Sequence, residues 1–385
     1  MHGYGTLQFV TLGMFIVDEF SFLDDDGNPT GKELAPQESI GGGGTYAAVG
    51  ARIWLPPDKI GMIVDRGNDW PSDIQEELDK YGPEMWMYRD QLSSTYHPFD
   101  YLTPRIRITP RDLRGTRLAR APTVHFVCSP SRAHSIVSEI HEEPKWHPTT
   151  IWEPIPDRCV PEELPALIKV LPHISVLSPN AEEALLVLSM ALPPTKAVVE
   201  EAAEKFLDFG VGSKGRGSVI IRSGELGAYV ATRANGGKWI DAFWTDQDKV
   251  VDVTGAGNSF LGGLGAGLYL AQGDVYQATL YATISAAFVI EQEGLPQMSE
   301  AVDDEGSKVT LWNGDSPEQE TAFAAGSIKE NENNDPIMYI YTTTTKYRHK
   351  IKISSSRKTN TNTHSGSAHC CPDSNLARLA ANSSC

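Results

Sequence analysis

Short runs of consecutive apolar residues alternate along the chain with longer segments whose apolar residues recur at helical spacing. The apolar runs lie at residues 7–17, 60–65, 123–128, 150–152, 173–177 and 218–222. Strands that are apolar throughout are buried on both faces, as in a parallel sheet whose connections are helices. The pattern therefore predicts an α/β fold with a mainly parallel central sheet and helices on both faces.

Two polar segments interrupt this rhythm. Residues 19–40 and 93–110 are rich in Pro, Gly, Thr and Tyr. Such composition favours short antiparallel strands that stand away from the main sheet. Residues 42–54, by contrast, are mostly small and begin with glycines, which predicts a small-residue helix opened by a run of glycines.

The composition changes after about residue 325. The segment is first Asn-rich, then alternates Thr, Tyr and Lys over 337–353, and ends in a Ser/Thr/Asn-rich stretch over 354–385. Such a segment buries too little apolar surface to offset the entropy of ordering it. We predict one domain over 1–325 and a disordered C-terminal extension over 326–385. The alternatives are coding sequence read in error and a weakly basic tail that recruits an acidic partner.

Charge and cysteine content exclude several classes of protein. The 385 residues carry a net charge of −17, whereas nucleic-acid surfaces are usually basic. The five cysteines show no zinc-like C-x-x-C pairing, which favours a reducing compartment without a metal cluster. The apolar start lacks a basic flank, and no apolar run reaches the ~18 residues of a membrane span. We therefore expect a cytoplasmic protein that binds neither nucleic acid nor membrane.

The glycine-rich segment V-D-V-T-G-A-G-N-S-F, from Val251 to Phe260, carries the most specific chemistry. Its pattern predicts a strand, a tight turn and a helix that begins near Ser259. Backbone N–H groups in such a turn lie at the positive end of the helix and bind anions. A second glycine motif, G-x-G-x-x-G at residues 210–215, precedes a predicted strand instead of following one. A dinucleotide site needs the opposite order, so we reject NAD binding.

The loop from Asp252 to Asn258 resembles the D-T-x-G-A-G-D signature of the PfkB (ribokinase-like) family of carbohydrate and nucleoside kinases. Three further segments occur in the family's order: the glycines of 41–50, the N-x-x-E pattern of 180–183 and the turn of 222–228. Residues 13–19, 101–105 and 312–317 are similar to the fungal maintenance-of-killer branch. The resemblance spans about residues 7–317 and implies a ribokinase-like fold whose small β-lid grows from 19–40 and 93–110.

The resemblance also implies a role for particular residues. It implies an anion hole formed by Gly255, Ala256 and Gly257, with Asn258 at the general-base position. It implies a substrate site at Asp18, Gly42, Gly43 and Glu153, and a nucleotide site at Asn180, Glu183, Ser223, Gly224, Gly227, Asp252 and Thr254. Asn180 and Glu183 would hold Mg²⁺ through its waters. The implied cofactors are ATP and Mg²⁺, with room for a monovalent cation, and the implied state is a monomer or a homodimer through the lid.

Several of these motifs also have a purely structural interpretation. Asn180 followed by Glu183 is typical of a helix N-cap with acidic first-turn residues. The turn at 222–228 is compatible with an ordinary hairpin, and Asp18 with a strand-end turn. Glycine runs such as 41–44 are common in flexible loops.

The residue at position 258 determines how much kinase activity the family resemblance leads us to expect. The family has aspartate there, and an amide cannot accept a proton, so a general-base contribution of about 10²- to 10⁴-fold is expected to be lost. On the sequence alone, aspartate at position 258 should raise turnover. The sequence thus favours ATP-dependent phosphotransfer to a hydroxyl of a sugar, nucleoside or related small molecule, impaired by Asn258. The alternatives are a catalytically silent nucleotide- or metabolite-binding regulatory protein and an interaction protein that works through its tail.

Overall fold

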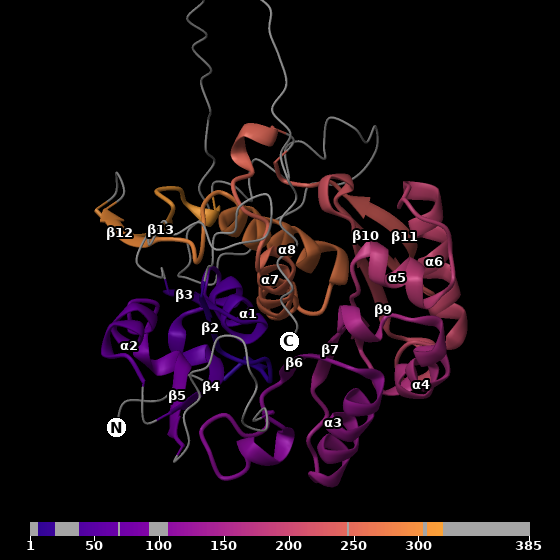
Figure 1. Cartoon of the computed structure of the whole chain (residues 1–385), viewed down its shortest axis with the longest axis horizontal. Helices are drawn as coiled ribbons and strands as arrows, with labels where there is room; N and C mark the ends of the chain where they lie inside the picture. Colours follow the sequence, from indigo (N-terminus) through magenta and orange to yellow (C-terminus); the bar gives the residue numbers. More distant parts are fainter. Residues whose placement is uncertain are drawn as a thin grey trace, which may run out of the picture. The chain divides into compact units, whose positions relative to one another are not determined.

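A computed structural model describes residues 7–19, 38–67, 70–91, 107–244, 246–302 and 306–318. Within them, a nine-stranded sheet has the order β11-β10-β9-β8-β7-β6-β1-β4-β5. All neighbouring pairs from β9 to β5 are parallel, and β10 and β11 continue the sheet as antiparallel strands. Figure 1 shows the strands and helices of this α/β body. The predicted fold class is confirmed.

The elements have the following bounds. The strands are β1 (Phe9–Thr11), β2 (Ile16–Glu19), β3 (Glu38–Gly41), β4 (Ile60–Arg66), β5 (Trp86–Asp90), β6 (Thr123–Cys128), β7 (Thr149–Pro154), β8 (Val176–Leu177), β9 (Ser218–Arg222), β10 (Ala228–Thr232), β11 (Gly236–Ile240), β12 (Met298–Val302) and β13 (Lys308–Trp312). The helices are α1 (Gly43–Arg52), α2 (Ser72–Asp79), α3 (Pro130–Glu142), α4 (Leu164–Val170), α5 (Ala181–Val187), α6 (Lys196–Phe209), α7 (Ala256–Leu270) and α8 (Val275–Ile290).

Two apolar cores lie on the two faces of the sheet. Val10 of β1 belongs to the core that includes residues of α3, α4, α5 and α6. Phe9, its neighbour in the same strand, belongs to the core that includes residues of α1, α2, α7 and α8. Successive side chains of a strand point to opposite faces of the sheet, so a strand that is apolar throughout contributes side chains to both cores. This is why the apolar runs of the sequence predict strands covered on both sides.

Small residues let α7 pack directly on α1. A Cβ atom added to Gly262 would lie 1.8 Å from the carbonyl oxygen of Ala47, and one added to Gly50 would lie 2.2 Å from that of Ser259. Such close backbone approach is possible only without side chains at these positions. The first residue of α1, Gly43, also lies near the first turn of α7, where a Cβ added to Gly43 would be 3.1 Å from Nδ2 of Asn258, and this positions the candidate site.

Some predicted elements differ from the structure. The run 7–17 is not one strand, because β1 ends at Thr11 and β2 begins at Ile16. The strand predicted at 173–177 is limited to Val176–Leu177. The strand predicted before the glycine-rich loop is wrong: residues 251–253 form no strand, and Val253 is 68% exposed. Burial against a sheet is what makes an apolar run a strand, and this segment lacks it.

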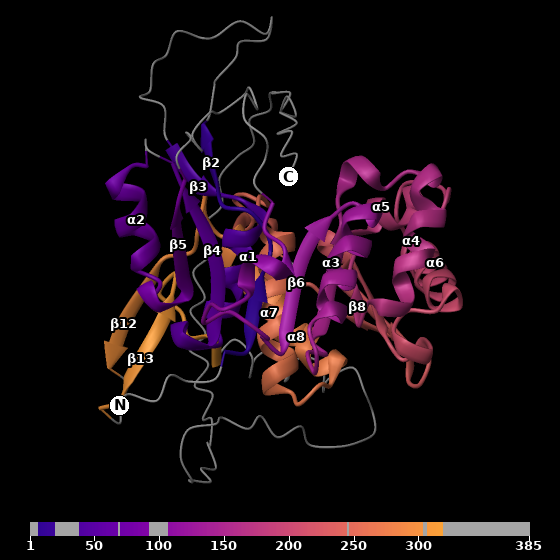
Figure 2. The ribbon, with the colours of Figure 1, turned by 90° about the horizontal axis from the view of Figure 1, so that it is seen from below.

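The lid segments are described only in part. β2 and β3 form a two-stranded antiparallel sheet in which Ile16 pairs with Gly41, separate from the nine-stranded sheet. Figure 2 shows this pair beyond one end of β4 and β5. Residues 20–37 and 92–106, and the predicted extension over 326–385, lie outside the described residues. No helix among the described residues is long and apolar enough to cross a membrane.

Candidate active site at the N-terminus of α7

The N-terminus of α7 presents unpaired backbone donors. Gly255 is the N-cap residue with a φ of 77°, and the helix begins at Ala256. The N–H of Ala256 donates to the carbonyl of Val253, whereas those of Gly257 and Asn258 have no acceptor among the described residues. First-turn N–H groups of a helix lack intrahelical partners and attract anions. The N–H groups of Gly257 and Asn258, which we call the cradle, are therefore available to an anion, and an anion hole formed by Gly255, Ala256 and Gly257 stays a prediction.

A side chain from a distant strand lies against this cradle. A Cβ atom added to Gly257 would be 2.1 Å from Nη1 of Arg222, at the end of β9. The guanidinium thus occupies the space that glycine leaves open. Within the loop, the carboxylate of Asp252 accepts a 2.9 Å hydrogen bond from the N–H of Thr254. Asp252 therefore holds the loop conformation, and nucleotide contacts by Asp252 and Thr254 stay predictions.

Asn258 and Glu153 meet although 105 residues separate them. The Nδ2 of Asn258 donates a 2.9 Å hydrogen bond to Oε2 of Glu153, which lies near the end of β7. The other carboxylate oxygen of Glu153 forms an ion pair with Nη2 of Arg222. Glu153 is only 7% exposed. A buried carboxylate thus lies beside Asn258, which the family resemblance assigns to the general-base position.

The predicted glycine signature borders the same point. A Cβ atom added to Gly43 would lie 3.1 Å from Nδ2 of Asn258, so the absence of a side chain makes room for the asparagine. Gly42 has a φ of 95°, and a Cβ there would meet the carbonyl of Met14 at 2.5 Å. Asp18 lies in β2 and pairs with Ser39 through the backbone, but its side chain lies outside what the structure describes. The structure therefore groups Gly43, Glu153 and Asn258.

Asn180 and Glu183 form a capping box at the start of α5. The Oδ1 of Asn180 accepts a 2.8 Å hydrogen bond from the N–H of Glu183, and Oε2 of Glu183 accepts one of 2.8 Å from the N–H of Asn180. The same Oε2 lies 3.7 Å from Nη2 of Arg222. The helix-cap interpretation of this motif is thus present in the structure. A role in holding magnesium stays a prediction.

Arg222 links the two carboxylates and was missed by sequence reasoning. Its Nη2 contacts Glu153, Glu183 and the carbonyl of Ser178, while its Nε is buried without a partner among the described residues. The sequence named Arg222 only as the first residue of a glycine turn. A basic residue at the carboxyl end of a buried strand was the available signal, because ligands bind at that edge of parallel sheets.

The turn after Arg222 is a hairpin between β9 and β10. The N–H of Ser223 donates a 2.7 Å hydrogen bond to the carbonyl of Gly227. A Cβ atom at Gly227 would lie 2.1 Å from the carbonyl oxygen of Ile240, whereas one at Gly224 would meet open space. Gly227 is therefore required by backbone packing. Nucleotide contacts of Ser223, Gly224 and Gly227 stay predictions.

Burial, together with the negative charge of Glu153, raises the pKa of Glu183 to about 7 against the opposing charge of Arg222. Above that pH two buried carboxylates share one guanidinium, which leaves a negative charge that a cation can balance. The described residues include no group of three His, Cys, Asp or Glu side chains arranged around a metal. The donor set fits a magnesium ion that keeps most of its waters, not a fully coordinated metal.

The pKa of Glu183 gives a testable pH dependence. The folded state retains a proton that an unfolded glutamate, with its ordinary value of 4.5, has lost, so the free energy of unfolding should fall as pH rises from 4.5 to about 7. Glu183→Gln keeps an oxygen for the Asn180 N–H but cannot ionise, so this fall should become shallower. Urea unfolding at pH 5, 6, 7 and 8 measures it. The exposed Glu162 provides the control variant Glu162→Gln, and equal slopes in all three proteins would contradict the prediction.

Comparisons with known proteins agree with this geometry. The pfkB family carbohydrate kinase profile matches residues 154–301. An uncharacterized protein of Schizosaccharomyces pombe is 33% identical over 80% of this chain and 90% of its own length. The MAK32 protein of Saccharomyces cerevisiae is 30% identical over 75% of this chain and 85% of its own length. The chain belongs to the PfkB family of carbohydrate kinases and resembles its fungal maintenance-of-killer members.

Solved structures show the same fold. The ribokinase of Giardia lamblia superposes with a TM-score of 0.57 at 18% identity, over 75% of this chain and 96% of the ribokinase. An Escherichia coli protein assigned as a ribokinase II, in complex with ATP and Mg²⁺, superposes with a TM-score of 0.51 at 19% identity, over 75% and 94% of the two chains. The ribokinase-like fold with its small β-lid is thus confirmed.

Proposed function

We propose that this protein transfers the γ-phosphoryl group of ATP to a hydroxyl of a sugar, nucleoside or related small molecule. One observation carries the proposal: the free N–H groups of Gly257 and Asn258 and the buried carboxylate of Glu153 converge at the N-terminus of α7. Donors that stabilise a phosphoryl anion and an oxygen that accepts a proton are the two requirements of this reaction.

Glu153 is the proton acceptor in this proposal. The acceptor hydroxyl gives its proton to the Glu153 carboxylate while its oxygen bonds to the γ-phosphorus and the bond from that phosphorus to ADP breaks. Asn258 orients the carboxylate through its 2.9 Å hydrogen bond. A loose transition state requires little proton transfer and depends mostly on positioning and charge stabilisation. The Glu153 carboxylate can therefore act as the proton acceptor although it is already paired with Arg222.

The nucleotide and magnesium are supported by the chemistry of the cradle. Gly257 has no side chain to obstruct a phosphate, and Arg222 adds a positive charge beside it. ATP with Mg²⁺ would supply the transferable phosphoryl group and screen its charge. The E. coli protein assigned as a ribokinase II has this fold and was solved in complex with ATP and Mg²⁺, which supports the same pair of cofactors here.

A specific observation supports the silent binding protein as second candidate. Both oxygens of Glu153 are engaged, one by Asn258 and the other by Arg222. A carboxylate held in this way is a weaker proton acceptor than a free one. The same contacts would then serve to bind a nucleotide without turnover.

Two measurements on the full chain separate the candidates. Thermal unfolding with millimolar ATP or ADP and Mg²⁺ reports binding, and ADP release with a panel of sugars and nucleosides reports transfer. Stabilisation together with acceptor-dependent ADP release supports the kinase. Stabilisation without release supports the silent binding protein, and the absence of any nucleotide-dependent shift contradicts both.

Gly257→Val should abolish the nucleotide-dependent shift in melting temperature. A Cβ atom there falls 2.1 Å from Nη1 of Arg222, so the branched side chain would displace the guanidinium and crowd the phosphate. Ala197→Val is the control, because it also introduces a branched side chain but at an exposed position of α6. An unchanged ATP shift in Gly257→Val would locate the phosphates elsewhere.

A further inference from the structure

A pocket lies beside Gly43, the residue that contacts Asn258. It is lined by Leu12, Gly13, Met14, Gly43, Val127, Cys128, Ser129, Ile155 and two arginines, Arg107 and Arg132. The lining contains no aspartate or glutamate among the described residues. Because Gly43 lines the pocket and also lies beside Asn258, a molecule in this pocket lies near Asn258, which donates to the proposed proton acceptor Glu153.

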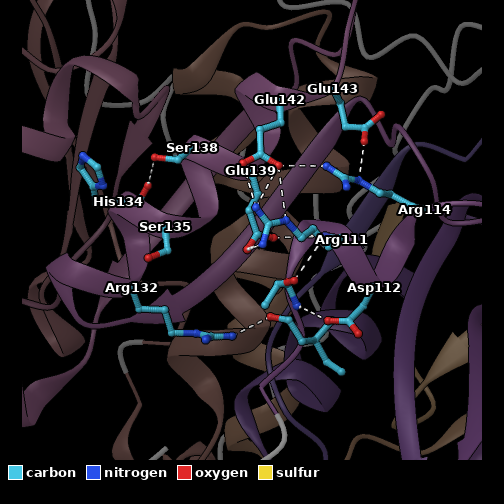
Figure 3. A network of polar contacts seen from close by, with 12 residues as sticks. Arg111, Asp112, Arg114, Arg132, His134, Ser135, Ser138, Glu139, Glu142 and Glu143 are labelled. Atoms are coloured by element: carbon cyan, nitrogen blue, oxygen red, sulfur yellow. Dashed lines mark hydrogen bonds and ion pairs between the residues drawn. The ribbon is translucent and has the colours of Figure 1, made fainter.

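The two arginines lack the carboxylate partners that their neighbours have. Arg111 and Arg114 form ion pairs with Glu142, and Arg114 also pairs with Glu143. Figure 3 shows Arg132 apart from these glutamates, and its guanidinium donates a 2.7 Å hydrogen bond to the backbone carbonyl of Ile108. Neither Arg132 nor Arg107 has an ion pair within the part of the chain that the structure describes.

Arg107 and Arg132 are close enough for their like charges to interact. Burial lowers the pKa of Arg132, and the positive charge of Arg107 lowers it as well, whereas the negative charges of Glu139 and Asp112, which are not part of the pocket lining, act in the opposite direction. Burial raises the pKa of Cys128 to about 12, so its thiol is neutral. Ser129 caps α3, whose positive end therefore also borders the pocket.

We propose that Arg107 and Arg132 bind an anionic group on the acceptor substrate, so that this protein phosphorylates a sugar phosphate or a sugar acid in preference to a neutral sugar. The inference rests on the proposed kinase function. Two guanidinium groups offer paired N–H donors that match the oxygens of a phosphate or a carboxylate. Binding an anion would remove the repulsion between them and hold the acceptor beside Asn258 and Glu153.

Titration calorimetry of the full chain with matched acceptors tests the proposal. The probes are ribose, ribose 5-phosphate and ribonate, together with glucose, glucose 6-phosphate and gluconate. At least one anionic member should bind ~10-fold or more tightly than its neutral counterpart, since hydrogen bonds to charged groups are worth ~1.5–3 kcal/mol. The phosphate and carboxylate arms identify the anionic group. Equal affinity of neutral and anionic members, or no binding by any anionic member, overturns the proposal.

Substitutions locate the binding group. Arg107→Gln and Arg132→Gln should each weaken the anionic probe ~10-fold and leave the neutral probe unchanged, whereas Arg114→Gln, outside the pocket, should change neither. Arg107 is exposed, so Arg107→Gln carries the test if Arg132→Gln does not fold. Anion binding that persists in both variants would place the anion at α7 and overturn the proposal.

ADP binding separates this proposal from the kinase function. The arginine variants should bind ADP like the wild type, because neither residue contacts the cradle at Gly257. Arginine-dependent anion binding in a protein that binds no ADP would overturn the kinase function while supporting the anion pocket. Normal ADP binding without any preference for anionic acceptors would overturn only the pocket proposal.

Discussion

Glu153→Gln is expected to lower kcat for phosphotransfer by ~10²- to 10⁴-fold while leaving ADP affinity nearly unchanged. Glutamine has the shape of glutamate, and its oxygen can still accept the hydrogen bond from Asn258, but it cannot accept a proton. The loss should therefore appear in kcat and not in the KM for ATP. Steady-state ADP release with the best acceptor of the panel measures it, beside ADP titration of the same protein.

Glu183→Gln is the matched control for this experiment. It also removes a buried carboxylate beside Arg222, but Glu183 contacts the N-terminus of α5 and not Asn258. Through the predicted magnesium site it should act on the KM for ATP with Mg²⁺, and it should leave kcat within a few-fold of the wild type. Equal turnover in wild type and Glu153→Gln would show that another group takes the proton, and Asp18 would be the next residue to replace.

Exchanging the carboxylate and the amide should restore much of the lost activity. In the double variant Glu153→Gln with Asn258→Asp, the carboxylate moves to the loop and the glutamine amide donates to it across the same 2.9 Å contact. We expect kcat to rise ~10²- to 10⁴-fold above that of Glu153→Gln alone. The loss of kcat in Glu153→Gln and its recovery in the double variant together test whether a carboxylate at this contact takes the proton.

The single variant Asn258→Asp should behave differently. It would place a second carboxylate about 2.9 Å from the first, in a buried setting where two such charges cannot both persist and one takes up a proton. We expect a lower melting temperature and no gain in kcat beyond a few-fold. A large gain in the single variant would show that Glu153 does not oppose the introduced carboxylate and would restore the expectation drawn from the sequence alone.

The strands that the sequence predicted well are those whose apolar runs are short and bounded. Residues 123–128 and 218–222 were predicted as they appear in β6 and β9. The run 7–17 failed because apolar residues continue past β1 into a connection and then β2. An apolar run indicates that a segment is buried, but it does not distinguish a buried strand from a buried turn. Only the tertiary structure shows where the chain bends.

The candidate site was predictable only in its local parts. Gly255, Gly257 and Asn258 are close neighbours in the sequence. A motif of consecutive residues can be recognised without the fold, so the sequence predicted the loop and the helix N-terminus. Glu153 was predicted to face the site from the family resemblance, in which an acid followed by proline stands at this strand end. Arg222 was not, because its importance depends on which strand ends adjoin β9 in the sheet order.

By itself, the sequence determined the α/β class, the family signature and the amide at position 258, because each depends on residue type and near-neighbour spacing. The tertiary structure decided what that amide does. It placed Asn258 against Glu153, Glu153 against Arg222, and two arginines without ion pairs beside Gly43 among the described residues. These contacts join residues from separate strands and helices. Their chemistry depends on distance and burial, which exist only once the chain is folded.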